Sequence, residues 1–312
     1  ETFDVDGFDA VIGNPPYNES PDITKDPHMK PVYQYWIYKF TKISKMNMFI
    51  TPSKWFTSMD KKLCELREYM KKMNIEFIHH YKEDNVFKNV KIKGGVSYYL
   101  INKEFSGKTN FNNELIDINK YDIILESKYY KLLSKIEKHF EKNLSEIYCS
   151  QGTFINSQIE KELTNNKDDI LCYVSKNKGL KKYLKKDKLS KEYKYWKVIT
   201  PAAAYKGTSG FADIYILDEN EIHSRSYISF KVNNKTEAEN LKKYMKCKLV
   251  HILLSLRKQT HNICNKDVFK WIPYISLDKC WNSKKLYDYF ELDNDDIKLI
   301  TEMKLDGKYD DI

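Results

Sequence analysis

Apolar residues follow two different spacings along the first third of the chain, and together these predict an α/β fold. Apolar runs predict strands at residues 5–13, 47–51, 75–81 and 95–102, the first of them buried. Helical spacing predicts a helix at 31–45, with Tyr33, Trp36, Ile37 and Phe40 in the core. An amphipathic helix is expected at 61–72, with Leu63, Leu66 and Met70 facing inward. The last two strands are expected to pair as an antiparallel edge of the sheet.

Residues 103–145 continue the first domain and lead into a linking helix, and beyond residue 145 the pattern changes and predicts a second domain of α+β type. Residues 106–113 are polar and loop-like, and 115–124 form a short strand or the start of a helix. A helix is expected at 127–142, with Leu132, Leu133 and Ile136 on one face. Strands are expected at 198–200, 213–217 and 228–232. One long helix at 235–256 and a terminal helix at 293–304 are also expected. We place a first domain at 1–125, a linking helix within 126–145 and a second domain at 146–312.

The most informative positions are Asn14, Pro15, Pro16 and Tyr17, which directly follow the apolar strand that ends at Gly13. The two prolines fix φ and make this turn rigid. In open α/β sheets, ligands bind at the carboxyl ends of the strands. The turn is therefore expected to present a carboxamide, a proline carbonyl and an aromatic ring at a ligand-binding edge.

These groups suit methyl transfer to a planar amine nitrogen. An exocyclic amine such as adenine N6 is a poor nucleophile, because its lone pair is delocalised into the ring. The Asn14 side-chain oxygen and the Pro15 carbonyl can accept its two hydrogens, free the lone pair and stabilise the positive charge that develops. Tyr17 can lie flat against the base. The alternative is an ordinary turn with a packed tyrosine.

Residues Phe8–Tyr17 resemble motif IV of the gamma-class adenine-N6 DNA methyltransferases of restriction–modification systems. Met48–Phe56 resembles the next central strand of that family, and Val86-Phe87 followed by Lys93–Ile101 resembles its motif VIII. The resemblance implies that Asn14, Pro15, Pro16 and Tyr17 are catalytic, and that Tyr17 and Phe87 stack against a flipped adenine. It also implies S-adenosylmethionine as the cofactor, double-stranded DNA as a partner, and a restriction subunit or fused nuclease as a further partner.

For the fold, the resemblance implies a partial Rossmann-like methyltransferase sheet in the first domain and a target-recognition, DNA-binding domain in the second. In that family a glycine-rich loop that binds S-adenosylmethionine precedes motif IV. No G-x-G follows a strand pattern in this chain, and too few residues precede Phe8 for a strand–loop–helix unit. We therefore expect this chain to be the carboxyl-terminal portion of a longer enzyme, and whether it is active alone stays open.

Composition changes this picture little. The net charge of +9 favours a polyanionic partner, although a generic lysine-rich surface explains it equally well. The six cysteines are scattered without a C-x-x-C pair, which predicts reduced cytosolic thiols and hence a cytoplasmic protein. No metal site is expected, and the longest apolar run, Leu249–Leu256, is too short to span a bilayer.

Two donor-rich runs in the second domain are candidates for DNA contact. Lys206 and Thr208 lie in the glycine-containing segment from Tyr205 to Gly210, which is either a donor-rich loop that reaches DNA or a long hairpin turn. The second run contributes Arg257, Lys258, Gln259 and His261. Arginine and glutamine can read guanine and adenine edges bidentately, so DNA contact is expected here, to bases or to phosphates.

Three hypotheses for function remain. The first is site-specific adenine-N6 methylation of DNA. The second is methylation of a protein glutamine at N5, since the same turn can hold an amide nitrogen, but such enzymes usually end soon after the motif VIII strand. The third is a non-catalytic module for DNA specificity. We find no paired-acidic-plus-lysine nuclease motif on a predicted strand.

Overall fold

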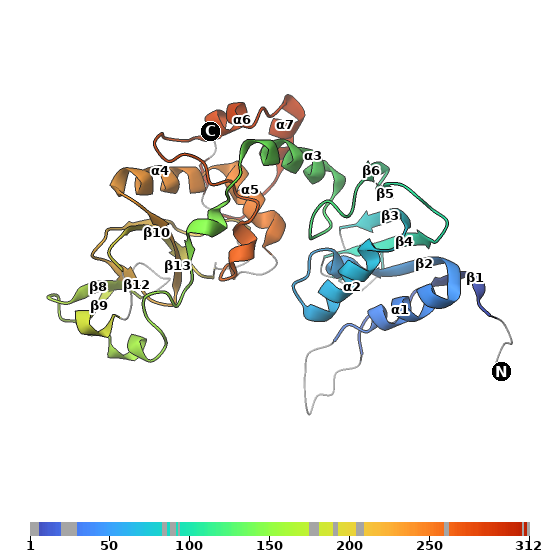
Figure 1. Cartoon of the computed structure of the whole chain (residues 1–312), viewed down its shortest axis with the longest axis horizontal. Coiled ribbons are helices and arrows are strands. Elements are labelled where there is room, and N and C mark those ends of the chain that lie inside the picture. Colours follow the sequence, from blue (N-terminus) through green and yellow to red (C-terminus); the bar gives the residue numbers. More distant parts are fainter. Residues whose placement is uncertain are drawn as a thin grey trace. The chain divides into compact units, whose positions relative to one another are not determined.

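A computed structural model gives the structure of the chain and divides it into two compact units, Glu1–Lys131 and Leu132–Ile312 (Figure 1). It describes residues 6–19, 30–82, 86–87, 92, 94–174, 181–189, 193–203, 209–258, 262–307 and 309–310. The division falls within α3 (Ser127–Ile136), at residues where the sequence predicts the linking helix.

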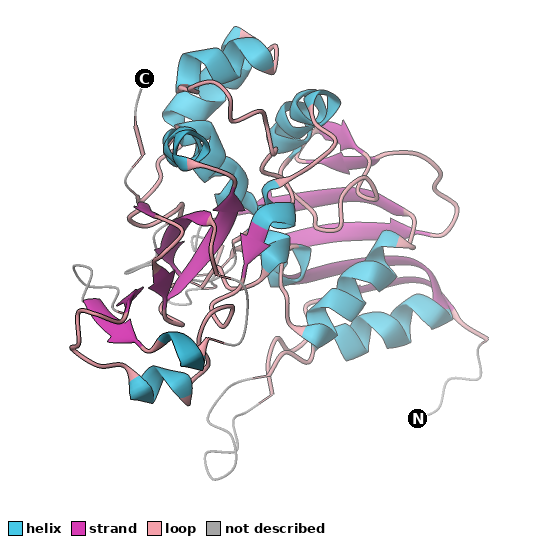
Figure 2. Ribbon diagram, turned by 60° about the vertical axis from the view of Figure 1, so that its left-hand side comes forward, coloured by secondary structure: helices cyan, strands magenta, loops and turns pink. Residues whose placement is uncertain are grey.

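A six-stranded mixed sheet forms the centre of the first unit and confirms the predicted α/β class (Figure 2). Its strands, in spatial order, are β1 (Phe8–Gly13), β2 (Ser44–Pro52), β4 (Val96–Asn102), β3 (Ile75–Tyr81), β5 (Thr109–Phe111) and β6 (Glu114–Ile116). β1 and β2 are parallel, whereas β4 runs antiparallel to both β2 and β3. The parallel pair is connected through α1 (Tyr33–Ile43), as a crossover between parallel strands requires.

The helices of this unit bury the faces that the sequence predicts, with one difference. α2 (Lys61–Lys71) buries Leu63, Leu66 and Met70 completely. α1 buries Tyr33 and Ile37, but Trp36 is 40% exposed. The apolar stripe on α1 is therefore wider than the core that it faces.

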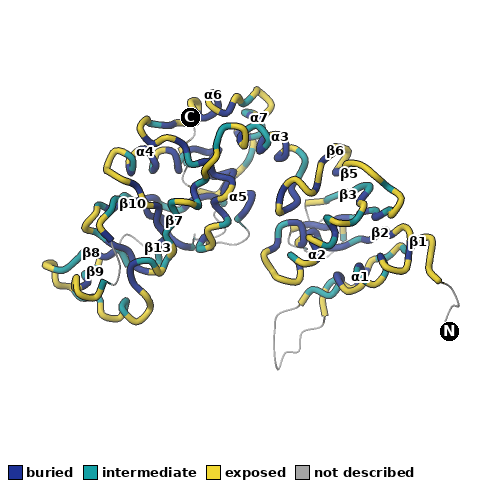
Figure 3. Tube along the Cα trace, in the orientation of Figure 1, coloured by how far each residue is buried: buried dark blue, intermediate teal, exposed yellow. Residues whose placement is uncertain are grey.

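β1 is not the buried strand that its apolar sequence predicts. Ile12 is 79% exposed and Phe8 is 43% exposed. Most of β1 is exposed (Figure 3). The reason is topological, because β1 stands at the end of the strand order and β2 is its one neighbour there. An apolar sequence indicates that a strand can be buried, but it does not show whether other elements cover that strand.

The segment expected to be a polar loop contains a β-hairpin instead. Asn112 and Asn113 have φ values of 48° and 71°, so they form the tight turn that joins β5 to β6. Asparagine tolerates this left-handed backbone better than most residues, and such turns match the twist of a hairpin. The hairpin extends the sheet beyond β3, so β3 and β4 pair antiparallel as predicted but lie inside the sheet and not at its edge.

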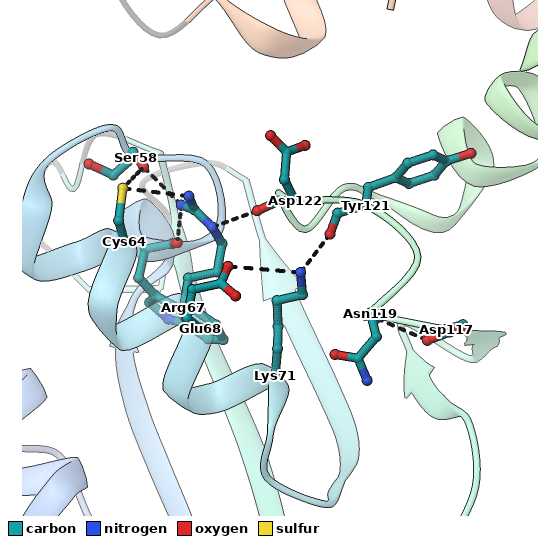
Figure 4. Close-up of polar contacts among 10 residues, drawn as sticks. Ser58, Cys64, Arg67, Glu68, Lys71, Asp117, Asn119, Tyr121 and Asp122 are labelled. Atoms are coloured by element: carbon teal, nitrogen blue, oxygen red, sulfur yellow. Dashed lines mark hydrogen bonds and ion pairs between the residues drawn. The ribbon is translucent and has the colours of Figure 1, made fainter. Parts of the chain in front are cut away.

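Arg67 and Lys71 on α2 hold the chain that leaves the hairpin. The Arg67 guanidinium donates to the carbonyls of Asp122, Trp55 and Ser58 at 2.9, 3.1 and 2.8 Å. The Lys71 ammonium donates to the Tyr121 carbonyl at 2.7 Å. Figure 4 shows both cations pointing from the helix toward backbone oxygens. The bonds to Asp122 and Tyr121 satisfy carbonyls in a segment without regular secondary structure, whereas those to Trp55 and Ser58 fix the chain before α2.

The second unit contains two small sheets. One has the order β11 (Tyr215–Leu217), β10 (Trp196–Pro201), β13 (Tyr227–Val232) and β7 (Tyr148–Cys149). The other consists of β12 (Ile222–His223), β8 (Ile170–Tyr173) and β9 (Lys181–Leu184). The remaining helices are α4 (Lys235–Met245), α5 (Lys248–Arg257), α6 (Ser283–Tyr289) and α7 (Asn294–Glu302).

Six 3-10 segments complete the list of elements: Ser53–Phe56, Glu137–His139, Leu144–Ile147, Ile159–Glu162, Lys186–Lys188 and Lys266–Phe269. The helix predicted at 127–142 is shorter than expected, because the α-helix ends at Ile136. Leu132, Leu133 and Ile136 are buried on one face, as predicted. α7 begins at a capping box formed by Asp293 and Asp296, close to its predicted start.

The prediction of a single long helix at 235–256 is wrong, because the helix ends after α4 and a new helix, α5, begins at Lys248. Asn234 caps α4, and Cys247 then takes an extended backbone with φ −65° and ψ 135°. No proline or glycine marks the break. α5 buries nine of its ten residues, so packing on all its sides and not local sequence decides its direction.

Candidate active site

The predicted catalytic turn lies at the carboxyl edge of the parallel pair. β1 ends at Gly13, which pairs with Phe49 of β2, and Asn14 follows immediately. Asn14 and Pro16 are exposed, Pro15 is buried and Tyr17 is half-buried. Burial of one proline fixes the turn against the protein, while the Asn14 carboxamide stays accessible to a ligand.

The chain beyond the turn is also tied down. The Tyr17 carbonyl accepts a hydrogen bond from the Val32 amide at 3.1 Å, and the Glu19 amide donates to the Lys30 carbonyl at 3.0 Å. These bonds join the exit of the turn to the start of α1. The turn is therefore held on both sides, by β1 and by the segment before α1, as a preorganised acceptor site requires.

The Tyr17 phenol lies among other buried hydroxyls. Burial raises the pKa of Tyr17, and the nearby Asn14 side chain opposes this shift. Burial also raises the pKa of Tyr99 on β4, and the phenol of Tyr17 adds to that effect while Thr51 opposes it. Tyr17 is thus neutral at physiological pH, and its ring can contact a base without adding charge.

Phe87 lies against Tyr17, although 69 residues separate the two in the sequence. Their ring centroids are 6.5 Å apart with an interplanar angle of 62°, an edge-to-face contact. The register explains this meeting: Tyr81 at the end of β3 pairs with Val96 at the start of β4, and Val96 also pairs with Pro52 at the end of β2. The segment that carries Phe87 therefore leaves and re-enters the sheet at the edge where Asn14 lies.

The donor run of the second unit is placed differently. Arg257 is 1% exposed, its guanidinium lies 4.6 Å from the Trp271 ring centroid, and its Nε donates to the Asp267 carbonyl at 2.7 Å. Lys258 donates to the Gly210 carbonyl at 3.0 Å, and burial lowers its pKa to about 8. The expectation that both cations face DNA does not fit these positions, because their polar groups are engaged within the unit.

The other four candidates for DNA contact, Lys206, Thr208, Gln259 and His261, lie outside the described residues. A further lysine of the second unit, Lys197, is completely buried. It donates to the carbonyls of Asp218 and Glu221 at 3.0 and 2.7 Å, and burial lowers its pKa to about 8. Composition thus predicts the basic character of this unit but not which cations reach its surface.

Three glycines at the edge of the catalytic turn differ in the space beside them. The glycine that ends β1, Gly13, has the Phe49 ring 3.9 Å from the position of a Cβ, which is ordinary contact. At Gly95 the Tyr81 carbonyl lies 2.1 Å from the position of a Cβ. Gly94, with a φ of +88°, has no atom within 4 Å of that position.

A cavity of about 590 Å³ lies at the opposite edge of the sheet and is separate from the catalytic turn. It is bounded by the end of α2, the start of β3 and the region around the β5–β6 hairpin, with Lys71, Lys72 and Lys108 among its lining residues. Within the described ranges, no group of three His, Cys, Asp or Glu side chains is arranged to hold a metal ion. In the same part of the chain, no helix is long and apolar enough to cross a membrane.

One residue of interest was missed in the sequence. His80 stands at the carboxyl end of β3, and its imidazole Nε2 lies 3.2 Å from the Gly94 carbonyl. No motif in the sequence assigns a role to His80. The useful signal was the combination of a strand-ending histidine with the Gly94-Gly95 pair before the next strand, since such a pair predicts a turn with positive φ.

Comparisons with known proteins agree with the geometry of the first unit. Residues 1–87 match the family model described as Eco57I restriction-modification methylase. An "Uncharacterized adenine-specific methylase" of Mycoplasma pneumoniae is 32% identical over 130 residues, which cover 40% of this chain and 31% of that relative. The predicted resemblance to adenine-specific methylases of restriction–modification systems is therefore confirmed, and the chain spans about a third of the length of that curated relative.

Solved structures with a similar course of the chain include two restriction enzymes. The type IIG restriction endonuclease BpuSI has a TM-score of 0.38 at 12% identity, over 95% of this chain and 49% of that one. The type IIL restriction-modification enzyme MmeI, solved in complex with DNA, has a TM-score of 0.43 at 9% identity, over 86% of this chain and 46% of that one.

Proposed function

We propose that this chain takes part in transferring a methyl group from S-adenosylmethionine to adenine N6 in double-stranded DNA, as part of a restriction–modification system. The first unit supplies the adenine site and the second unit supplies contacts for target recognition. The observation that carries the proposal is the meeting of Tyr17 and Phe87 beside Asn14 at one edge of the sheet. The family match of residues 1–87 supports it independently.

In this proposal Asn14 and Pro15 act on the amine. The exposed carboxamide oxygen of Asn14 and the backbone carbonyl of Pro15 accept the two N6 hydrogens of the adenine. These acceptors stabilise the positive charge that develops on N6 as it forms a bond to the methyl carbon. The rigid prolines keep the acceptors in place before the base arrives, so little reorganisation is needed.

Tyr17 and Phe87 hold the ring of the base. A base in a duplex has to leave the stack before N6 can reach the turn, and stacking on protein aromatics offsets part of that cost. The two rings now contact each other edge-to-face at 6.5 Å.

S-adenosylmethionine is proposed as the methyl donor because residues 1–87 match the model of a methylase family. DNA as the partner is supported by the net charge of +9. Lys206, Thr208, Gln259 and His261 remain our proposed DNA contacts, whereas the buried Arg257 and the engaged Lys258 are withdrawn from that group.

The experiment that tests the proposal measures transfer of label from S-adenosylmethionine to duplex DNA. The chain is assayed as it stands and with a segment that binds S-adenosylmethionine joined to its amino terminus. Nucleoside digestion then identifies the product. We expect N6-methyladenine when the cofactor segment is present.

Two other outcomes would contradict the proposal. Label in protein and not in DNA favours the methylation of glutamine N5. DNA binding without any transfer of label favours a non-catalytic module for DNA specificity.

A further inference from the structure

The His80 imidazole occupies a fixed position beside the adenine site. Its ring lies 5.4 Å from the Phe56 centroid and 6.3 Å from the Phe111 centroid, edge-on to both. Its Nε2 lies 3.2 Å from the Gly94 carbonyl, and its Nδ1 is buried without a hydrogen-bond partner among the described residues. Because Phe56 and Phe111 pack against the His80 ring and its one polar contact is with the Gly94 carbonyl, the ring is suited to hold that carbonyl in place.

The backbone of His80 is fixed as well. The side-chain oxygen of Asn112 accepts from the His80 amide at 2.8 Å, and the Asn112 side-chain nitrogen donates to the His80 carbonyl at 3.2 Å. Asn112 belongs to the β5–β6 turn, where its φ of 48° directs the amide toward β3. The hairpin missed by sequence analysis therefore serves to fix the strand position that carries the imidazole.

The turn that His80 contacts is tightly packed. Gly95 has φ +79°, and a Cβ there would lie 2.1 Å from the Tyr81 carbonyl and 3.0 Å from the His80 Nε2. The Gly95 amide donates to the Ile92 carbonyl at 2.9 Å, and the Gly95 carbonyl accepts from the Ser53 amide at 3.0 Å. The turn is thus held between the end of β3 and the segment that follows β2.

The other side of the Phe87 segment is fixed by an ion pair. Lys82, directly after β3, pairs with Glu126, which also pairs with Lys128 at 3.1 Å. Burial acts to raise the pKa of Glu126, but its hydrogen bonds with Lys82 and Lys128 outweigh this and hold the pKa below its ordinary value. Phe87 therefore stands between two anchored points of the chain, at Lys82 and at Gly94.

We propose that His80 is a positioning residue for adenine methylation, which holds Phe87 beside Tyr17 through the hydrogen bond from its Nε2 to the Gly94 carbonyl. This inference rests on the proposed function for its catalytic consequence, but its structural content does not depend on it. His80 touches neither Asn14 nor Tyr17 in any recorded contact. It acts through the turn that returns the Phe87 segment to β4.

The protonation state of His80 agrees with this role. Burial lowers the pKa of His80, while the Gly94 carbonyl and the charge of Glu126 oppose the shift and Lys82 adds to it. The ring is therefore neutral at physiological pH. With Nδ1 buried and unpartnered, the tautomer that carries its hydrogen on Nε2 is favoured, because a buried N–H without an acceptor is costly.

The test compares His80→Gln with His80→Phe. Glutamine can place a donor near the position of Nε2, whereas phenylalanine keeps the packing against Phe56 and Phe111 and loses the donor. His79→Phe is the matched control, because His79 is the adjacent residue and its ring stacks on Tyr98 at 4.8 Å instead of facing Gly94. Each variant is measured in full-length chain with the cofactor segment joined.

The first readout is the rate of tryptic cleavage within residues 82–95 of the folded protein without DNA. We expect His80→Phe to be cleaved about fivefold faster than wild type, which corresponds to the loss of one hydrogen bond worth about 1 kcal/mol. His80→Gln and His79→Phe should stay close to wild type. This readout needs no methylation, so it decides the structural claim even where no methyl transfer is found.

The second readout is the kinetics of DNA methylation. We expect kcat to fall about fivefold in His80→Phe with KM for DNA little changed, because the base is held after DNA has bound. Recovery in His80→Gln supports the hydrogen bond. Equal losses in both variants, or wild-type cleavage and kcat in His80→Phe, overturn the proposal.

If His80→Phe does not fold, a second variant changes the glycine turn that His80 contacts and leaves His80 itself unchanged. Gly95→Ala places a methyl group against the Tyr81 carbonyl and the His80 Nε2. We expect faster cleavage within residues 82–95 and a lower kcat, together with a lower melting temperature, because the methyl group meets a backbone oxygen at a φ of +79°. Unchanged cleavage in this variant also overturns the proposal. Absence of methyl transfer by the wild type contradicts the proposed function instead.

Discussion

The catalytic turn and the pair Arg257 and Lys258 were both predicted to contact DNA, and the structure places them in opposite environments. Asn14 is exposed at a strand end, near the ring of Tyr17, which contacts Phe87 from a distant part of the sequence. Arg257 is 1% exposed and packed on Trp271. The difference lies in what each prediction used: the first used position relative to a strand, and the second used side-chain chemistry alone.

This comparison shows which sequence signals place a residue at a surface. The carboxyl end of a strand in an open α/β sheet has a defined location, so a motif directly after β1 lies at the ligand-binding edge by topology. A donor at the end of a buried helix has no such constraint. Arg257 ends α5, whose residues are nearly all buried, and its guanidinium finds backbone and aromatic partners inside the unit.

The largest expected effect separates catalysis from stability at Asn14. We expect Asn14→Ala to lower kcat for adenine methylation by about 10²–10³-fold, because one of two acceptors for the developing charge is lost. The melting temperature should be unchanged, since the side chain is exposed. Rate measurements on the joined enzyme check this, with Asn18→Ala as the exposed control outside the turn. Unimpaired methylation by Asn14→Ala would falsify the proposed role.

At Arg257 the expectation is reversed. Arg257→Ala should reduce the free energy of unfolding by roughly 2–4 kcal/mol, because it removes packing on Trp271 and the hydrogen bond to the Asp267 carbonyl. Denaturant titration measures this change. DNA affinity per folded molecule should stay within about twofold of wild type, since the guanidinium does not reach the surface. A stable variant with much weaker DNA binding would return Arg257 to the recognition surface.

Phe87 tests the aromatic half of the adenine site. Phe87→Ala should lower kcat for methylation by about tenfold or more, because stacking of a base on an aromatic ring is worth roughly 1–3 kcal/mol. Phe87→Tyr, which keeps the ring, should retain most of the activity and serves as the control. Steady-state kinetics with duplex DNA give the measurement. Equal activity of the alanine and tyrosine variants would remove Phe87 from the site.

The smallest expected effect concerns pH and the interior of the second unit. His223 is completely buried, its Nδ1 lies 2.9 Å from the Ser224 carbonyl and its Nε2 lies 2.9 Å from the Ser229 hydroxyl. Burial lowers the pKa of His223 to about 4. Its folded pKa is thus below its unfolded pKa of about 6.5, so the unfolded state takes up the proton first.

Stability should therefore fall as pH decreases from about 6.5 toward 4, with His223 contributing about 1 kcal/mol between pH 6.5 and 5.5. Denaturant titrations at several pH values measure the slope. His223→Gln should flatten it in part, because His251, whose pKa burial also lowers to about 4, still contributes. An unchanged slope in His223→Gln would show that other groups control the acid response.

Much of the fold of the first unit could be predicted from local pattern. β3 has the predicted bounds, α2 differs by one residue, and the inward residues of α2 are completely buried. The hairpin at 109–116 could not be predicted from hydrophobicity, because its strands have three residues each and its signal is the Asn112-Asn113 turn. Short strands gain their stability from the neighbouring β3 and carry little pattern of their own.

The sequence by itself determined the chemistry of the turn, the strand in front of it and its relation to adenine-specific methylases, because these depend on residue types at fixed local spacing. Only the tertiary structure decided that Phe87 meets Tyr17, that His80 holds the Gly94 turn, that Arg257 is buried and that β1 leaves Ile12 exposed. Each of these depends on which distant segments pack together. Packing is decided by the register of β2, β3 and β4 and by the surroundings of α5, which no local spacing encodes.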